Sequence, residues 1–544
     1  MIDLKGKPFY LTEEQVAGVQ QKLAAMSTRE KVGQLFCVMG GSFYEEERVK
    51  LVKDYHVGGV LFRPAPAEEV KRWYEPLDAV ADLPLLKCAN LEEGGYGAVS
   101  DGTMFGFPMQ VAAANDLGMV EKFAQVCASE AMSVGTNVTF SPVADIDVNF
   151  QNPITNVRTY GSDVEKVRSM CDRYVQTLQN MGMAACAKHF PGDGVDHRDQ
   201  HLHPSYNSLP AAEWYASYGS VYQTMIDHGL MSVMVGHIVA PYVVKDIAPE
   251  MEFEDMLPAT LSPEMLQGVL RGKLGFNGMI FTDATIMGGF TMALPRAEAL
   301  PRAIEAGCDM LVFNTDFYAD YENLLAGVEQ GILSRKRLDE AVARILAMKA
   351  KVGAVEAPQP VPAKKWRKEC ADLSVTLVKD KDAILPISQE RFPHIRLVML
   401  GKDDTPDGSL RAMAEEKLRA EGFDVEVYDP MADEMHPSHE LPQDRLTLYF
   451  ANLIQFSNQT AIRINWCPKH AMDAPKHLRE EHCAMVSFAN PYLLQDVPRM
   501  RCYINAYTAT EATVDAVIDK LLGRSEFKGV SPVDPFCGLM DTHF

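Results

Sequence analysis

The chain has 544 residues, of which 47% are hydrophobic and 23% are charged, a globular composition that excludes a disordered or fibrous protein. Acidic residues (74) outnumber basic ones (52), and the resulting net charge of −22 argues against nucleic acid or a membrane surface as a partner. The sequence has no transmembrane run, no signal-peptide core at its start and 11 dispersed cysteines without CxxC pairs, which together predict a cytoplasmic protein with reduced thiols.

Short, continuous apolar runs alternate with helical patterns over the first two-thirds of the chain. Such runs are typical of parallel strands that are buried on both faces. Eight strand-like runs within about 350 residues, with helical patterns between most of them, predict a (β/α)8 barrel. The runs are 33–39, 59–62, 85–89, 137–143, 184–187, 232–236, 278–282 and 309–313, and examples of the helical patterns are 119–134, 163–181 and 263–272.

A Pro- and Ala-rich stretch separates the predicted barrel from a second α/β segment. We predict a barrel over 1–352, a linker over 353–366 and a layered α/β sandwich domain over 367–544. The strand candidates of the second domain are 395–400, 423–428, 446–454, 484–489 and 502–507, with helical patterns over 408–421 and 510–523.

Ionisable side chains follow most of the predicted barrel strands. Active sites of such barrels lie at the carboxyl ends of the strands, so these side chains are expected to converge on one rim. A single polar residue at a strand end is unremarkable, but a charged group at most of the ends favours a functional rim. Examples are Glu92 after the third strand, Lys188 and His189 after the fifth, His237 after the sixth and Asp283 after the seventh.

Asp283 stands directly after the strand GMIFT and just before a Gly-Gly pair. A carboxylate held on a rigid strand end suits a nucleophile or a general base. Aspartate is also a favoured N-cap of a following helix, so the position alone leaves both interpretations open.

The segment 188–203 (KHFPGDGVDHRDQHLH) holds four histidines and three aspartates among loop-forming residues. It is a solvated polar loop, a metal site, or an acid/base loop in which Asp199 orients His201. A metal site built from His189, His201 and His237 ranks second, because the first predicted strand ends without a ligand and the only HxH lies in this loop.

Two further basic residues are candidates for contact with substrate. Lys188 is either a Schiff-base nucleophile or, given its neighbour His189, a hydrogen-bond donor to substrate hydroxyls. Arg158 in NPITNVRTYGSD is another candidate donor. A ring of charged donors and acceptors is what a polar substrate with many hydroxyls requires.

These motifs resemble glycoside hydrolase family 3, and within it the β-N-acetylglucosaminidase-like branch. The resemblance covers nearly the whole chain and is carried most specifically by the loop motif and by the segment around Asp283. The similar segments include STREKVGQLF (27–36), GGVLF (58–62), FSPVADID (140–147), VRTYGSD (157–163), AKHFPGDG (187–194), PATLSPEMLQGVLRGKLGFNGMIFTDA (258–284) and INAYTATEATVDAVIDKLLG (504–523).

The resemblance implies an exo-acting, retaining β-N-acetylhexosaminidase without a cofactor. By position, Asp283 matches the nucleophile that forms a covalent glycosyl-enzyme intermediate, and Asp199-Gln200-His201 matches the catalytic dyad in which the histidine is the acid/base. Lys188, His189 and Arg158 match donors to the sugar, with Glu92 and His237 as further candidate ligands. The expected partner is a small carbohydrate, and a homo-oligomer is compatible with the sequence. We expect the loop 192–203 to be mobile without ligand.

Two positions depart from the family pattern: Leu91 replaces a sugar-binding aspartate, and Asp193 replaces a histidine. They bear on sugar identity more than on reaction type. The alternatives to the hexosaminidase are a β-glucosidase-type or phosphorolytic family 3 enzyme, a metal-dependent barrel hydrolase, and a sugar-binding protein without turnover. Phosphorolysis is conceivable because a neutral imidazole repels phosphate less than a carboxylate does.

Overall fold

The computed structural model describes residues 2–353, 356–432 and 442–544. The chain forms two compact units, and each is assembled from segments that are not contiguous in sequence. The first comprises Met1–Thr103, Val120–Asn152 and Val164–Val361, and the second comprises Met104–Met119, Pro153–Asp163 and Pro362–Phe544. No helix in the described ranges is both long enough and apolar enough to cross a membrane.

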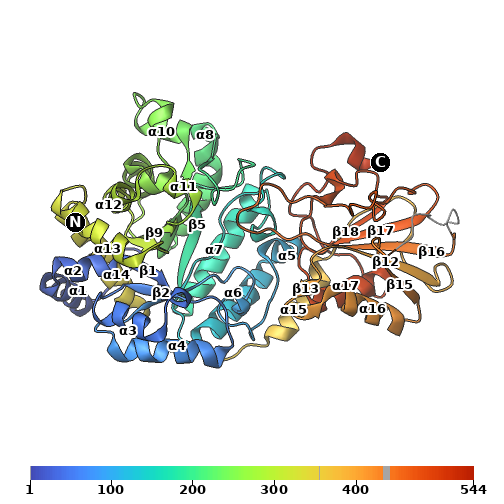
Figure 1. Cartoon of the computed structure of the whole chain (residues 1–544), viewed down its shortest axis with the longest axis horizontal. Helices are drawn as coiled ribbons and strands as arrows, with labels where there is room; N and C mark the ends of the chain where they lie inside the picture. Colours follow the sequence, from blue (N-terminus) through green and yellow to red (C-terminus); the bar gives the residue numbers. More distant parts are fainter. Residues whose placement is uncertain (1, 354–355, 433–441) are drawn as a thin grey trace. The chain divides into compact units, whose positions relative to one another are not determined.

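Eight parallel strands of the first unit close into a barrel in the order β1-β10-β9-β7-β5-β4-β3-β2, which confirms the predicted (β/α)8 architecture (Figure 1). Each of the eight predicted apolar runs overlaps one of these strands, and six of the runs contain the whole strand. Their bounds are β1 Phe36–Met39, β2 Gly59–Leu61, β3 Leu86–Ala89, β4 Val138–Thr139, β5 Ala184–Phe190, β7 Ser232–Val235, β9 Met279–Ala284 and β10 Met310–Val312. A short parallel pair, β6 (Ser205–Tyr206) and β8 (Ile238–Val239), lies outside the barrel sheet.

Helices connect the strands of the barrel. They are α1 Glu13–Ala25, α2 Thr28–Gln34, α3 Glu45–Lys53, α4 Ala67–Val80, α6 Leu117–Met132, α7 Val164–Asn180, α8 Ala211–Trp214, α9 Ser220–Asp227, α10 Pro241–Ile247, α11 Gly288–Thr291, α12 Arg296–Ala306, α13 Phe317–Glu329 and α14 Arg335–Val352. The predicted helix 263–272 is a π-helical segment over Glu264–Lys273.

The strand bounds differ from the predicted runs in ways that matter for function. β1 begins only at Phe36, because a Ser27/Glu30 capping box starts helix α2 and that helix continues to Gln34. β5 and β9 both extend further than predicted. Lys188, His189 and Asp283 therefore lie within the last residues of strands. The pairing of β5 with β7 and that of β9 with β10 shift register beside these residues, and the backbone of Lys188 is hydrogen-bonded to Pro142 and Ala144 after β4.

The second unit is built on one six-stranded sheet in the order β11-β18-β17-β16-β12-β15. All neighbours are parallel except β11 and β18. The strands are β11 Thr376–Asp380, β12 His394–Gly401, β15 Asp424–Tyr428, β16 Arg445–Asn452, β17 His482–Ser487 and β18 Cys502–Asn505; the helices are α5 Pro108–Ala113, α15 Ala363–Ser374, α16 Leu410–Ala420 and α17 Glu511–Leu521, and a small hairpin joins β13 Asp404–Thr405 to β14 Gly408–Ser409.

This sheet separates two apolar cores, one of which includes side chains of α15, α16 and α17, so the layered α/β domain is confirmed. The sequence prediction did not include β11, an edge strand in which only two consecutive residues, Leu377 and Val378, are apolar. Of the predicted linker, residues 354 and 355 lie outside the described ranges, and α15 begins within it at Ala363.

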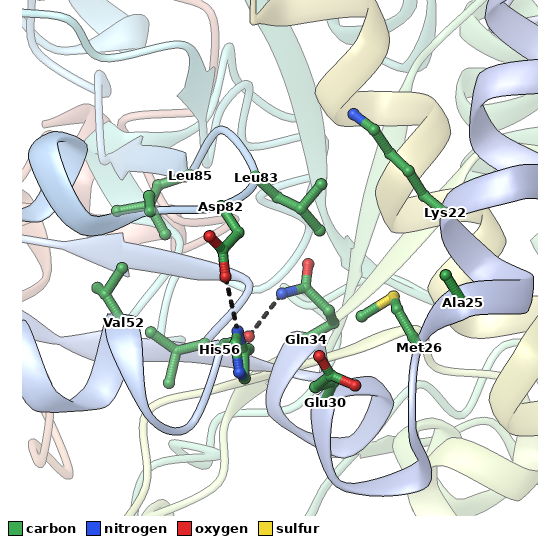
Figure 2. A pocket seen from close by; sticks show the side chains of 12 residues that line it. Lys22, Ala25, Met26, Glu30, Gln34, Val52, His56, Asp82, Leu83 and Leu85 are labelled. Atoms are coloured by element: carbon green, nitrogen blue, oxygen red, sulfur yellow. Dashed lines mark hydrogen bonds and ion pairs between the residues drawn. The ribbon is translucent and has the colours of Figure 1, made fainter.

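A cavity of about 190 Å³ opens at the end of the barrel where the strands begin, opposite the rim that carries the predicted site (Figure 2). Its lining includes Gln34 of α2 and His56 from the loop that leads into β2. The Gln34 amide donates to the carbonyl of His56 (2.5 Å) and accepts a hydrogen bond from the Lys349 ammonium (2.7 Å). Lys349 is 3% exposed. Burial, reinforced by the positive charge of Lys22, lowers the pKa of Lys349 to about 7.

We expect Lys349→Met to reduce the pH dependence of stability between pH 7 and pH 10. The pKa of Lys349 is about 7 in the folded chain and near its ordinary 10.5 when unfolded, so between these values the unfolded chain binds more protons. Stability therefore rises with pH across this window and is lost as the pH falls, by up to about 1.4 kcal/mol per unit. Thermal unfolding at several pH values measures the slope, with the exposed Lys351→Met as control. Equal slopes in the wild type and in Lys349→Met would contradict this prediction.

Candidate active site

Asp283 lies near the carboxyl end of β9, and its side chain is 15% exposed. Its Oδ1 accepts a hydrogen bond from the backbone N–H of Ala284 (2.7 Å). Its Oδ2 lies 3.8 Å from Nε2 of His189. The carboxylate is thus held by a rigid strand and keeps one oxygen toward an imidazole, an arrangement suited to a fixed nucleophile.

The electrostatic surroundings of Asp283 favour its ionised form. Burial is the strongest influence and by itself would raise the pKa of this carboxyl group. Electrostatic interaction with three neighbouring imidazoles, together with the hydrogen bond from the Ala284 backbone N–H, outweighs burial, and the pKa of Asp283 lies below its usual range. These imidazoles belong to His189, His237 and His201, in order of decreasing influence. An ionised carboxylate at this position is competent for nucleophilic attack.

Asp145, from the loop after β4, orients His189. Its Oδ2 lies 2.7 Å from Nδ1 of His189, and its Oδ1 accepts a hydrogen bond from the His189 backbone N–H (3.1 Å). Both side chains are buried. This pair directs Nε2 of His189 toward Asp283, which makes Asp145 a functional residue that the sequence analysis did not assign. Its position after the fourth predicted strand was the available signal.

His237 contacts the last residue of β9 and a residue of a neighbouring 3₁₀ turn. Its Nε2 lies 3.1 Å from the carbonyl oxygen of Ala284, and its Nδ1 lies 2.9 Å from the hydroxyl of Thr260. Burial lowers the pKa of His237 and favours the neutral ring, which then carries its proton on Nε2 because a carbonyl oxygen only accepts. Both ring nitrogens have protein partners, and the predicted contact of His237 with sugar stays a prediction.

Lys188 forms an ion pair with Glu92, whose Oε1 lies 2.6 Å from the ammonium nitrogen. The same ammonium donates to Oδ1 of Asn90 (3.0 Å). Between them Leu91 is fully buried, and its carbonyl accepts a hydrogen bond from the hydroxyl of Tyr174 (2.9 Å). The side chain that replaces the family aspartate therefore packs in the core, while both of its neighbours reach Lys188. These contacts suit a lysine that donates hydrogen bonds.

Asp199 and His201 form the predicted dyad. Oδ1 of Asp199 accepts a hydrogen bond from the His201 backbone N–H (2.8 Å) and lies 2.7 Å from Nδ1 of the ring. The carboxylate is fully buried, whereas the imidazole is 27% exposed. Asp199 thereby fixes the orientation of the ring and leaves Nε2, the nitrogen on the opposite side of the ring, away from the carboxylate.

The loop that carries Asp199 and His201 is hydrogen-bonded to the segment that follows Asp283. The backbone N–H of Gly288 donates to the carbonyl of His201 (2.8 Å), and that of Gly289 donates to the carbonyl of Gln200 (3.1 Å). A Cβ at Gly288 would lie 2.1 Å from the carbonyl oxygen of Leu202, so this close approach requires a residue without a side chain. The mobility predicted for the loop 192–203 stays a prediction, and in this structure the loop is held against the turn after Asp283.

The remaining predicted ligand, Arg158, belongs to the second unit. It lies in a short 3₁₀ turn over Asn156–Arg158, and its guanidinium donates to the carbonyl of Ile154 (3.2 Å). Its predicted contact with sugar stays a prediction. In the described ranges 2–353, 356–432 and 442–544, no group of three or more His, Cys, Asp or Glu side chains is arranged to hold a metal ion.

Three comparisons relate the chain to known proteins. Residues 27–348 match the family model described as Glycosyl hydrolase family 3 N terminal domain. A protein of Cellulomonas fimi named beta-N-acetylglucosaminidase/beta-glucosidase is 40% identical over 564 residues, covering 100% of both chains. A beta-hexosaminidase of Xanthomonas campestris is 31% identical over 303 residues, covering 54% of this chain and 88% of its own.

Two solved structures are also similar to this chain. The structure of the beta-glucoside phosphorylase BglX has a TM-score of 0.92 and 42% identity, covering 99% of each chain. A glycoside hydrolase family 3 beta-N-acetylglucosaminidase from Paenibacillus has a TM-score of 0.78 at 24% identity, covering 95% of this chain and 100% of its own, and that likeness concerns the fold.

Proposed function

This chain belongs to glycoside hydrolase family 3, and from that premise we propose that it is a retaining β-N-acetylhexosaminidase that acts through a covalent glycosyl-Asp283 intermediate. The observation that carries the proposal is the pairing of an ionised, strand-held carboxylate with an Asp-oriented imidazole on an adjoining loop. The name of the Cellulomonas fimi relative supports N-acetylglucosamine as the sugar, with glucose as a second sugar.

In the first step, Oδ2 of Asp283 attacks the anomeric carbon, and the bond to the leaving oxygen breaks. Nε2 of His201 gives its proton to that oxygen, so the aglycone departs as an alcohol. In this proposal Lys188 and His189 hold sugar hydroxyls. In the second step, His201 takes a proton from water, the water oxygen attacks the anomeric carbon, and the Asp283 carboxylate is released. The anomeric configuration is retained because each step inverts it once.

Phosphorolysis is the second candidate, and two observations favour it. The acid/base is an imidazole, which in its neutral form does not repel a phosphate anion as a carboxylate does. In addition, a structure at 42% identity is named a beta-glucoside phosphorylase. In this variant of the second step, a phosphate oxygen attacks the anomeric carbon, and the product is a β-glycosyl 1-phosphate.

Product analysis with and without phosphate tests the sugar and the acceptor together. We expect an aryl β-N-acetylglucosaminide to react faster than the aryl β-glucoside, to give free sugar in phosphate-free buffer, and to give increasing sugar 1-phosphate as phosphate is added. Proton NMR of the reaction identifies each product and its anomeric configuration. Free sugar alone at every phosphate concentration would remove phosphorolysis, whereas an α product would remove the retaining mechanism.

A further inference from the structure

Asp193 is a buried carboxyl group at the start of the loop that carries the dyad, and it is 2% exposed. Its Oδ1 accepts hydrogen bonds from the side-chain amide of Asn152 (2.9 Å) and from the backbone N–H of Gly194 (2.8 Å). Its Oδ2 accepts a hydrogen bond from the side-chain amide of Gln200 (3.3 Å). Three donors are therefore directed at one carboxylate, a set that the ionised form satisfies best.

Gln200 connects this carboxylate to the two halves of the site. It lies between Asp199 and His201 in sequence and is fully buried. Its side-chain oxygen accepts a hydrogen bond from the backbone N–H of His237 (2.8 Å), and its carbonyl accepts one from Gly289 (3.1 Å). Rotation of the Gln200 side chain would break the contact with His237 and displace the backbone that presents the imidazole of His201.

The groups that face Asp193 include both charged and neutral side chains. Asp145 accepts a hydrogen bond from the backbone N–H of Asp193 (2.7 Å) and also holds His189, and the hydroxyl of Tyr218 donates to the carbonyl of Asp193 (2.7 Å). Burial, followed by repulsion from Asp145, raises the pKa of Asp193 to about 7, against the opposing effects of the Gly194 N–H, His189 and Asn152. The carboxyl group thus changes charge near neutral pH.

We propose that Asp193 is a positioning residue for acid catalysis. Through its hydrogen bond to Gln200 it holds the loop that bears His201 in position relative to the strand that bears Asp283. The inference rests on the proposed function, because it assigns proton donation to His201. Protonation of Asp193 turns one acceptor oxygen of its carboxylate into a donor. That donor then faces the side-chain N–H group of Gln200 or of Asn152, which is also a donor. The loop then loses its hydrogen bond to Asp193, and the transfer of a proton to the leaving group becomes slower.

Asp193→Asn tests this, because the amide keeps the shape of the carboxyl group but presents a donor in place of one acceptor. The readout is the dependence of kcat/KM on the leaving group. Dinitrophenolate leaves without a proton, whereas a methoxyphenol needs one. We expect kcat/KM of Asp193→Asn to fall roughly 10- to 100-fold on the methoxyphenyl glycoside and less than about threefold on the dinitrophenyl glycoside.

The pH profile gives a second readout. With the methoxyphenyl substrate, we expect kcat/KM of the wild type to fall as the pH drops below about 7, and we expect this acidic limb to be absent in Asp193→Asn.

Two further variants make the test decisive. Asp196→Asn is the matched control, because Asp196 lies in the same loop and binds Arg198 and the backbone of Tyr206 rather than Gln200. Gln200→Met removes the hydrogen bond to Oδ2 of Asp193 and is expected to show the same selective loss, which keeps the test valid if Asp193→Asn does not fold. Equal losses on both substrates, or no loss, in Asp193→Asn and Gln200→Met would overturn the inference.

His201→Ala, measured alongside, separates this inference from the proposed function. If His201→Ala loses the same factor in kcat/KM on both substrates, or loses nothing, the assignment of the acid is wrong and the proposed function fails. If His201→Ala shows the selective loss and Asp193→Asn does not, only the inference about Asp193 is overturned.

Discussion

Asp283→Asn is expected to lower kcat by about 10⁴-fold or more on every glycoside, with little change in the thermal midpoint of unfolding. The amide oxygen can still accept the hydrogen bond from Ala284 that Oδ1 accepts in the wild type, so the local fold is preserved. A neutral amide is a poor nucleophile, so the glycosyl-enzyme bond does not form. Initial rates on an aryl glycoside measure the loss.

Asp316→Asn is the matched control, because Asp316 follows the neighbouring strand β10 and caps α13, a role that asparagine fills equally well. In Asp283→Ala, azide is expected to restore turnover by attacking the anomeric carbon directly as the aryl group leaves. A single inversion makes the product an α-glycosyl azide. Substantial activity in Asp283→Asn, or a β azide from Asp283→Ala, would show that another group is the nucleophile.

His201→Ala is expected to lower kcat/KM by roughly 10²- to 10⁴-fold on substrates whose leaving group needs a proton, and to have little effect on dinitrophenyl glycosides. In the proposed mechanism, the imidazole that Asp199 orients is the proton donor of the first step and the base of the second. With an activated substrate the first step proceeds and the intermediate accumulates. Added azide, which needs no base, should then raise kcat and give a β-glycosyl azide.

The second histidine of the HxH pair provides the control. His203 lies two residues further along the loop, where its Nδ1 is 3.3 Å from the carbonyl oxygen of Pro204. His203→Ala is expected to keep near-normal rates on both kinds of substrate. Unchanged dependence on the leaving group in His201→Ala would place the acid/base on another residue and would contradict the dyad assignment.

The barrel could be predicted because its strands are buried on both faces and therefore appear as continuous apolar runs. The same pattern placed Lys188, His189, His237 and Asp283 at strand ends, and the structure has them there. The edge strand β11 was missed because it has no such run: only Leu377 and Val378 of its five residues are apolar. The length of the apolar run therefore determined whether the barrel strands and β11 could be recognised in the local sequence.

The contacts that orient the catalytic groups could not be predicted in this way. The pairing of Asp145 with His189, and the bridge from Asp193 through Gln200 to the backbone of His237, join residues 37 to 48 positions apart or link them across a loop. Polar side chains have no periodic pattern comparable to that of apolar ones, and their partners depend on how each loop returns across the rim. The motifs identified the chemical groups, and only the folded loop shows how they are held.

The segmented second unit has a consequence for how the chain is made. Helix α5 and the residue before it bind partners that are synthesised much later. The backbone N–H of Phe107, the N-cap of α5, donates to the hydroxyl of Thr508. The side-chain amide of Gln110 donates to the hydroxyl of Thr513, 403 positions further along the chain. At a translation rate of about 5 to 20 residues per second, α5 leaves the ribosome roughly 20 to 80 seconds before those partners exist. All six residues of α5 are buried in the finished fold, so throughout that interval the apolar residues of this segment lack the late-made partners that cover them in the folded chain.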